Sequence, residues 1–100
     1  MFKINFIFAK KGVLKYISHL DLMRLFARGL RRTGLLLKMT EGYSPHIKLS
    51  LKRALKLGLE SENEEATVML RQVVSPEDFC SLLQKALPEG IVIKSAANSF

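Results

Sequence analysis

The first nine residues alternate in a way that restricts the fold more than any other feature of the sequence. The apolar positions share one side of an extended segment: Phe2, Ile4, Phe6 and Phe8. Lys3 and Asn5 fall on the other side, together with Ile7. A period of two predicts a β-strand that buries one face. Such a strand needs a second layer of structure over its apolar side.

The next segment predicts a helix for that second layer. Ser18 is a good N-cap and is followed three residues later by Asp21, an arrangement typical of a helix start. The helix is expected to run to about Thr33 and to stop at Gly34. Its apolar side chains cover a broad arc, and Gly29 within that arc indicates close packing against another element.

The rest of the chain predicts a second helix and several strands. A cap, a proline and two acids at 75–78 start the second helix, which ends at 88–90. The other expected elements are strands at 35–39, 47–52, 65–74 and from Ile91, a loop at 41–46, an extended or irregular stretch at 54–60 and an acidic turn at 61–64. The order predicts one α+β domain over residues 1–100, a ferredoxin-like two-layer sandwich. Two helices would cover a mostly antiparallel sheet of four or five strands.

Charge is distributed unevenly along these 100 residues, whose net charge is +7. Residues 1–56 hold 13 Lys and Arg but only two acids, Asp21 and Glu41. Residues 57–100 hold three Lys and Arg and seven acids. A basic face of this kind attracts polyanions, and nucleic acid is the partner that it favours.

Several other classes of protein are disfavoured. Cys80 is the one cysteine, so no internal disulfide forms, and we expect a reduced chain in the cytoplasm. No apolar run approaches the ~20 residues of a membrane span, so no membrane partner is expected. No Walker loop, GxGxxG motif or nucleophile elbow is present, and no cofactor or metal is predicted.

Two basic segments are the candidates for nucleic-acid binding. One is a stripe on the first helix formed by Arg24, Arg28, Arg31 and Arg32. The other follows the loop and contains Lys48, Lys52, Arg53 and Lys56. The planar fork of arginine suits phosphate oxygens. The alternative interpretation is an ordinary solvated helix face.

The loop itself contains two ring side chains beside a cation. Tyr43 and His46 would stack on an unpaired base while Lys48 holds a phosphate, as in single-strand recognition. The alternative is a packed loop in which Tyr43 covers the core and His46 is hydrogen-bonded to the backbone. His19 and His46 are also weak candidates for acid–base catalysis, because an unperturbed imidazole titrates near neutrality. Together with Lys48 they form the one set that would suit a metal-independent RNA-processing enzyme.

Three ordered motifs resemble a known family. They are the stretches 16–26 (YISHLDLMRLF), 41–50 (EGYSPHIKLS) and 54–61 (ALKLGLES). The chain thereby resembles the radical-SAM-linked family of uncharacterised bacterial proteins, which are encoded beside, or fused to, a radical SAM protein. The chain departs from the family pattern at Ile47, where members often have proline, and at Lys52-Arg53, where they often have Gly-Pro. Typical members are longer, so residues 1–100 are expected to match the N-terminal part of such a protein.

The resemblance implies a bacterial cytosolic protein that works with a radical SAM partner. The chain has no CxxxCxxC motif and is therefore not itself the radical SAM catalyst. The leading hypothesis is a non-catalytic accessory module that binds RNA, or a similar anionic substrate, for that partner. The alternatives are the RNA-processing enzyme described above and a domain that only docks onto the partner protein.

Overall fold

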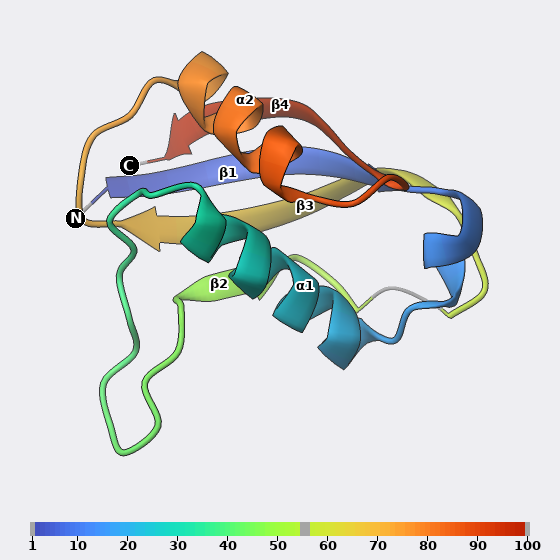
Figure 1. Ribbon diagram of the computed structural model, residues 1–100, viewed down its shortest axis with the longest axis horizontal. Coiled ribbons are helices and arrows are strands. Elements are labelled where there is room, and N and C mark those ends of the chain that lie inside the picture. The colour runs from blue at the N-terminus through green and yellow to red at the C-terminus, as the bar shows by residue number, and fades with distance from the viewer. Residues whose placement is uncertain (1, 55–56, 100) are drawn as a thin grey trace.

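The computed structural model describes residues 2–54 and 57–99. Its elements, in chain order, are β1 (Phe2–Lys10), the 3-10 helix η1 (Gly12–Tyr16), α1 (His19–Arg32), β2 (Leu49–Leu51), β3 (Ser61–Leu70), α2 (Pro76–Ala86) and β4 (Ile91–Ser99). The strands form one antiparallel sheet in the order β2-β3-β1-β4. Both helices lie on one face of this sheet (Figure 1). The predicted ferredoxin-like two-layer sandwich is confirmed, with four strands.

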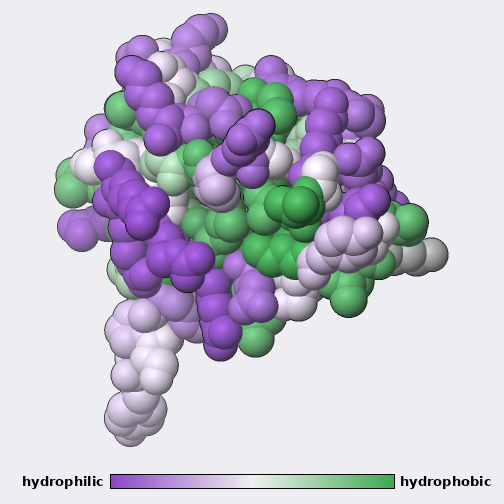
Figure 2. Space-filling model, turned by 45° about the vertical axis from the view of Figure 1, so that its right-hand side comes forward, coloured by the Kyte–Doolittle hydropathy of each residue, from purple (hydrophilic) through white to green (hydrophobic). Residues whose placement is uncertain are grey.

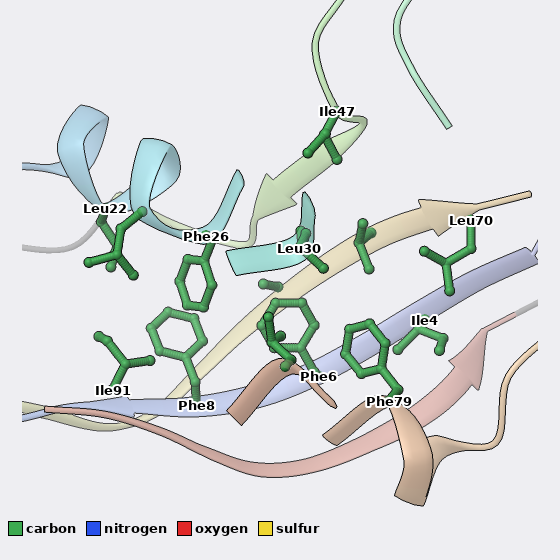
Figure 3. Packing of buried hydrophobic residues seen from close by; sticks show 14 residues of the cluster. Ile4, Phe6, Phe8, Leu22, Phe26, Leu30, Ile47, Leu70, Phe79 and Ile91 are labelled. Atoms are coloured by element: carbon green, nitrogen blue, oxygen red, sulfur yellow. The ribbon is translucent and has the colours of Figure 1, made fainter. Parts of the chain in front are cut away.

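The alternation in β1 sets the core as predicted. Ile4, Phe6 and Phe8 are fully buried on the helix side of the sheet, and Phe26 of α1 and Phe79 of α2 pack onto them (Figure 3). The ring centroid of Phe26 lies 4.8 Å from that of Phe8 and 5.6 Å from that of Phe6, both edge-on. Aromatic pairs favour this geometry over flat stacking.

The opposite face of the sheet carries no helix, and we call it the open face (Figure 1). Side chains of a strand alternate between faces, so Lys3, Asn5, Ser50, Thr67 and Met69 lie on the open face because their neighbours pack in the core. The Thr67 hydroxyl of β3 donates a 2.6 Å hydrogen bond to Oδ1 of Asn5 on the adjacent strand β1.

The predicted helix starts, at Ser18 for α1 and at Ser75 for α2, are both confirmed. The Ser18 hydroxyl accepts a hydrogen bond from the backbone N–H of Asp21, and α1 ends one residue before Thr33, its C-cap. Gly34 follows with φ +80°, in the left-handed region. The close packing expected at Gly29 is also found, because a Cβ there would lie 2.8 Å from Cδ2 of Leu87.

The strand predictions are correct at the ends of the chain and partly wrong in the middle. Residues 35–39 form no strand. They join the end of β3 through the isolated bridge Leu37–Leu70 and a backbone hydrogen bond from Lys38 N to Met69 O, and the bridge Met39–Ile47 lies outside the strands of the sheet. The strand predicted at 47–52 is confined to residues 49–51, and the one predicted at 65–74 ends at residue 70. Of the stretch expected to be extended or irregular, residues 55–56 lie outside the described part of the chain.

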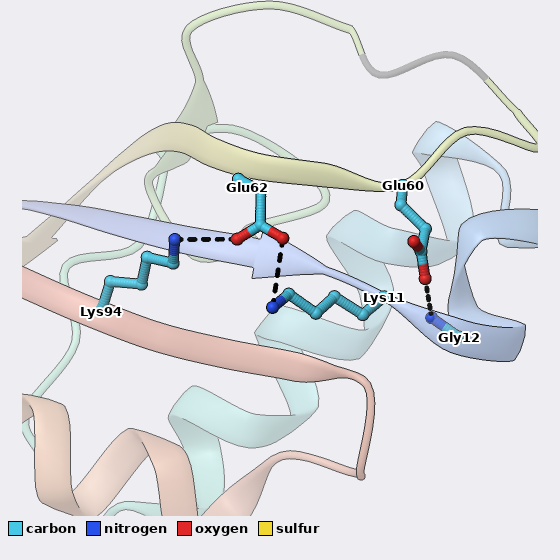
Figure 4. Close-up of polar contacts among 5 residues, drawn as sticks. All are labelled: Lys11, Gly12, Glu60, Glu62 and Lys94. Atoms are coloured by element: carbon cyan, nitrogen blue, oxygen red, sulfur yellow. Dashed lines mark hydrogen bonds and ion pairs between the residues drawn. The ribbon is translucent and has the colours of Figure 1, made fainter.

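The acidic turn predicted at 61–64 is instead the first part of β3, which pairs there with β1, and its acids have basic partners on other segments. Glu62 binds Lys94 Nζ at 3.0 Å and Lys11 Nζ at 3.1 Å, and these two contacts lower the pKa of its carboxyl (Figure 4). Just before the strand, Glu60 Oε2 accepts a 2.8 Å hydrogen bond from the N–H of Gly12. The run of acids thus ties β3 to the ends of β1 and β4.

Glu64 is the buried member of this run, with only 3% of its surface exposed. Arg53 donates to both of its carboxylate oxygens, at 2.9 Å from Nε and 2.6 Å from Nη2, and the Ser61 hydroxyl donates to it as well. These hydrogen bonds lower the pKa of Glu64 against the opposing effect of burial, and the charge of nearby Lys10 lowers it further.

No helix in residues 2–54 and 57–99 is long and apolar enough to cross a membrane.

Replacing the buried carboxylate should destabilise the fold in a pH-dependent way. We expect Glu64→Gln to lower the free energy of unfolding at pH 7 by about 2 kcal/mol, because hydrogen bonds to a charged acceptor are lost. The pKa of Glu64 is lower in the folded state, so its ionised form stabilises the protein above the unfolded pKa of about 4.3. That contribution disappears as the pH falls through the folded value. Urea denaturation at pH 7 and at acid pH measures both effects.

The matched control for this variant is Glu65→Gln on the other face of β3. Glu65 has no ion pair within the described residues, so its replacement should change the free energy of unfolding by less than about 0.5 kcal/mol. Equal losses in the two variants, or a loss at Glu64 that does not shrink on acidification, would contradict the structural role assigned to Glu64.

Candidate nucleic-acid interface

Residues 38–48 form a hairpin that projects from the edge of the sheet (Figure 1). Its two arms are joined by backbone hydrogen bonds from Lys48 N to Lys38 O and from Thr40 N to His46 O, of 2.9 and 2.7 Å. Lys38 N donates to Met69 O, and Met69 N donates to Lys48 O, so the base of the hairpin is fixed to the end of β3. The tip extends away from the rest of the molecule.

A hollow of about 320 Å³ lies where the hairpin meets the open face. It is lined by Lys3, Thr40, His46, Ile47, Lys48, Leu49, Ser50, Thr67 and Met69. The ammonium groups of two lysines, three hydroxyls and one imidazole therefore surround an apolar floor. Among the described residues no acidic side chain lines it.

The ring of His46 has a defined orientation in this hollow. Its Nδ1 lies 3.0 Å from the carbonyl oxygen of Ser44, and a carbonyl oxygen only accepts hydrogen bonds. Nδ1 therefore carries the hydrogen, which leaves Nε2 as the free ring nitrogen. The backbone N–H of His46 donates to the Thr40 hydroxyl at 3.1 Å, which holds the residue in place.

Tyr43 stands at the tip of the hairpin with its whole side chain exposed. The alternative of a packed loop is therefore wrong for Tyr43, whereas the hydrogen bond that it predicted between His46 and the backbone is present. Gly42 beside it has φ +121°, a conformation that side chains rarely adopt and that turns the chain at this point. The result is an aromatic ring with both faces accessible, three residues from the imidazole of His46. A ring of this kind suits stacking on a nucleobase.

The arginine stripe lies in the helical layer, on the other side of the sheet from the hollow. Arg24 is paired with Asp21 at 3.4 Å, whereas Arg31 projects into solvent. Arg28 and Arg32 border a groove of about 340 Å³ between α1 and the end of α2, whose other lining residues are Leu25, Lys85, Ala86, Leu87 and Pro88. We call this the interhelical groove. The structure therefore does not bring the stripe together with His46 and Lys48.

The basic residues that follow the hairpin differ from one another. Lys52 follows β2, and its side chain is exposed to solvent and accessible to a ligand. Arg53 donates to buried Glu64, so its charge is largely compensated within the fold. Lys56 lies outside the described residues.

The two histidines lie far apart in the fold. His19 is the first residue of α1, and the hairpin that carries His46 lies beyond the other end of this helix (Figure 1). A helix of 14 residues is about 21 Å long. His19 therefore cannot share a substrate atom with His46 and Lys48, since proton transfer needs hydrogen-bond contact.

The remaining chemistry-bearing groups form no centre. The described ranges 2–54 and 57–99 contain no cluster of three His, Cys, Asp or Glu side chains that would hold a metal. Burial, and then the charge of Glu77, raise the pKa of Cys80 and make its thiol less reactive.

Several residues of the hollow were not candidates on sequence grounds. Lys3, Ser50, Thr67 and Met69 come from three different strands, and only the sheet order brings them to one place. The sequence feature that could have indicated this site is the polar side of the first strand, with Lys3 and Asn5, because a polar side marks a sheet face that no helix covers.

Comparison with known families identifies the chain. Residues 3–99 match a family described as an uncharacterised protein conserved in bacteria (DUF2344), and the chain belongs to this family. No curated protein matches it significantly.

Proposed function

We propose that this member of the DUF2344 family is a non-catalytic module that binds single-stranded RNA, or a similar anionic substrate, for a radical SAM partner. The observation that carries the proposal is the hollow beneath the hairpin, which Lys3, His46 and Lys48 line together, with the exposed ring of Tyr43 three residues before His46 on the same hairpin. Cations, a polar ring and a stacking platform are the parts that single-strand binding needs.

The chemistry of the hollow favours a ligand rich in hydrogen-bond acceptors. Lys3 and Lys48 donate only, and within the described residues neither has an ion pair or a side-chain hydrogen bond. The Thr40 hydroxyl already accepts from His46 N–H and retains its own hydrogen for donation. Phosphate oxygens would lie at the rim, while the apolar floor beside Met69 would accept part of a base.

The size and form of the site favour a single strand over a duplex. At about 320 Å³ the hollow is at the lower end of small-ligand sites and suits about one nucleotide. An RNA duplex exposes its backbone and shallow minor groove and keeps its bases stacked. A fully exposed Tyr43 would stack on an unpaired base next to the one that enters the hollow.

The radical SAM partner follows from the family resemblance, and an exposed apolar cluster supports a protein contact. The cluster lies at the end of the molecule opposite the hairpin and consists of Val13, Tyr16, Leu20, Leu57 and Leu59. A hydrogen bond from Gly58 N to Lys15 O holds its two segments together. Figure 2, in which this end comes forward, shows hydrophobic side chains exposed among hydrophilic ones. Such patches commonly mark protein interfaces. The partner would supply the catalysis.

Substitutions in the hairpin test RNA binding and separate its two components. Lys48→Ala should reduce the magnitude of the slope of log K against log salt by about 0.7, the value for one lost phosphate contact to a single strand. Tyr43→Ala should weaken binding about tenfold at every salt concentration and leave the slope unchanged, because stacking is not ionic. Fluorescence anisotropy with a short labelled RNA measures the affinity and its salt slope. The salt concentration is varied from about 50 to about 200 mM, a range in which ionic binding changes strongly.

Arg31→Ala provides the matched control, because it removes one charge from the helical layer. The RNA affinity of this variant, and the slope of log K against log salt, should stay close to those of the unchanged protein. Absence of binding at low salt, or an equal effect of Arg31→Ala and Lys48→Ala, would contradict the assignment to the hairpin.

A charge placed in the apolar cluster tests whether this cluster binds the protein partner. Val13→Asp should abolish co-purification with a co-expressed radical SAM protein and leave RNA affinity unchanged, because Val13 lies far from the hairpin. Val73→Asp is the control, since the two valines are almost equally exposed, at 81% and 79%, and Val73 lies in the segment after β3 whereas Val13 belongs to η1. Retained co-purification of Val13→Asp, or equal loss in both variants, would contradict a docking role for this cluster.

A further inference from the structure

The interhelical groove is a second cationic site, on the opposite layer from the hollow. Arg28 and Arg32 are one turn apart on α1, on the flank that faces α2. Lys85 lies in the last turn of α2 and borders the groove from the other side. Apolar walls come from Leu25 and from Leu87 with Pro88.

Gly29 is the residue that shapes this groove. A Cβ at this position would lie 2.8 Å from Cδ2 of Leu87 and 3.6 Å from the carbonyl oxygen of Ala86. The end of α2 therefore approaches the backbone of α1 directly between the turns that carry Arg28 and Arg32. This close approach brings Lys85 to the same opening as the two guanidinium groups.

The charges in the groove are not compensated by the fold. Within residues 2–54 and 57–99, Arg28, Arg32 and Lys85 have no ion pair or side-chain hydrogen bond, and no acidic side chain lines the groove. Elsewhere the same fold pairs Arg24, Arg53 and Lys94 with carboxylates. Two like charges one turn apart destabilise a helix slightly, so an anion bound between them would relieve repulsion.

From this arrangement we infer that the interhelical groove binds a phosphomonoester carried on a small, partly apolar body, such as a nucleoside monophosphate. Two guanidinium forks and an ammonium group match the several oxygens of a terminal phosphate. The apolar walls suit a sugar or base, and a volume of about 340 Å³ suits one such ligand. This site is independent of RNA binding in the hollow.

Titration of the full chain with UMP and with uridine tests this inference by NMR. UMP should shift the amide signals of residues that line the groove, and uridine should not. Arg32→Ala should weaken UMP binding about tenfold or more, because it removes hydrogen bonds to a charged acceptor. Arg28→Lys keeps the charge but removes one fork, and should also weaken binding. The control Arg31→Ala lies on the same helix outside the groove and should leave the affinity within about twofold.

The phosphomonoester could be a free nucleotide or the 5′ end of an RNA. A second pair of ligands, two short RNAs that differ only in a 5′ phosphate, distinguishes these sources when it is compared with the pair of UMP and uridine. Tighter binding of the phosphorylated member of either pair supports the inference, provided that Arg32→Ala removes the difference. Equal binding of both members in each pair, or equal effects of Arg31→Ala and Arg32→Ala, overturns it. Lys48→Ala should not alter UMP binding, so failure of this inference and failure of RNA binding in the hollow are distinguishable.

Discussion

Phe26 of α1 packs edge-on against both Phe6 and Phe8 of β1, and Phe79 of α2 lies 5.5 Å from Phe6 between ring centroids. These four rings hold both helices on one side of the sheet. Because β1 pairs with β3 and β4 on its two edges, burying its aromatic side exposes the polar side of the central strands. The position of the candidate RNA site therefore follows from the packing of the core, since the hollow occupies the face that the helices leave uncovered.

Charge pairing divides the surface of this fold into compensated and uncompensated regions. The acids at the start of β3 pair with Lys11 after β1, with Lys94 of β4 and with Arg53 after β2, and Glu64 does so with almost no exposure. The net charge of +7 is consequently concentrated elsewhere. Among the described residues, no acidic side chain lines either the hollow or the interhelical groove. Charges that the fold leaves without partners are available to an anionic ligand at little desolvation cost.

Local patterns predicted most of the architecture but not the way in which the middle of the chain joins the sheet. The alternation of β1 and the caps at Ser18 and Ser75 depend on neighbouring residues, and all three were read correctly. The segment 61–64 looks like a turn because it is acidic and polar. It is a strand because it pairs with β1, and Arg53 and Lys94 neutralise two of its carboxylates there. Residues 35–39 have an apolar pattern but pair through isolated bridges, a difference that only tertiary contacts determine.

The candidate sites show the same limit. His46 and Lys48 stand out because they are adjacent in the loop, but Lys3 and Thr67 join them only through the order of the strands. The four helix arginines looked like one stripe. The close approach at Gly29 divides them, since it draws two of them into the groove with Lys85 and leaves the others in solvent.

The hairpin combines a fixed base with an exposed tip, and this division suits a ligand that is flexible before it binds. The backbone of Lys48 is held by hydrogen bonds to residues 38 and 69, so its side chain starts from a fixed point beside the hollow. Tyr43 has no such support and is fully exposed, so its ring is free to follow the base that stacks on it. A single strand of RNA has unstacked bases in many orientations, and a rigid aromatic position would select few of them. A cation on a fixed stretch of backbone, combined with an aromatic ring at an exposed tip, therefore fits the physical character of this ligand better than a rigid site would.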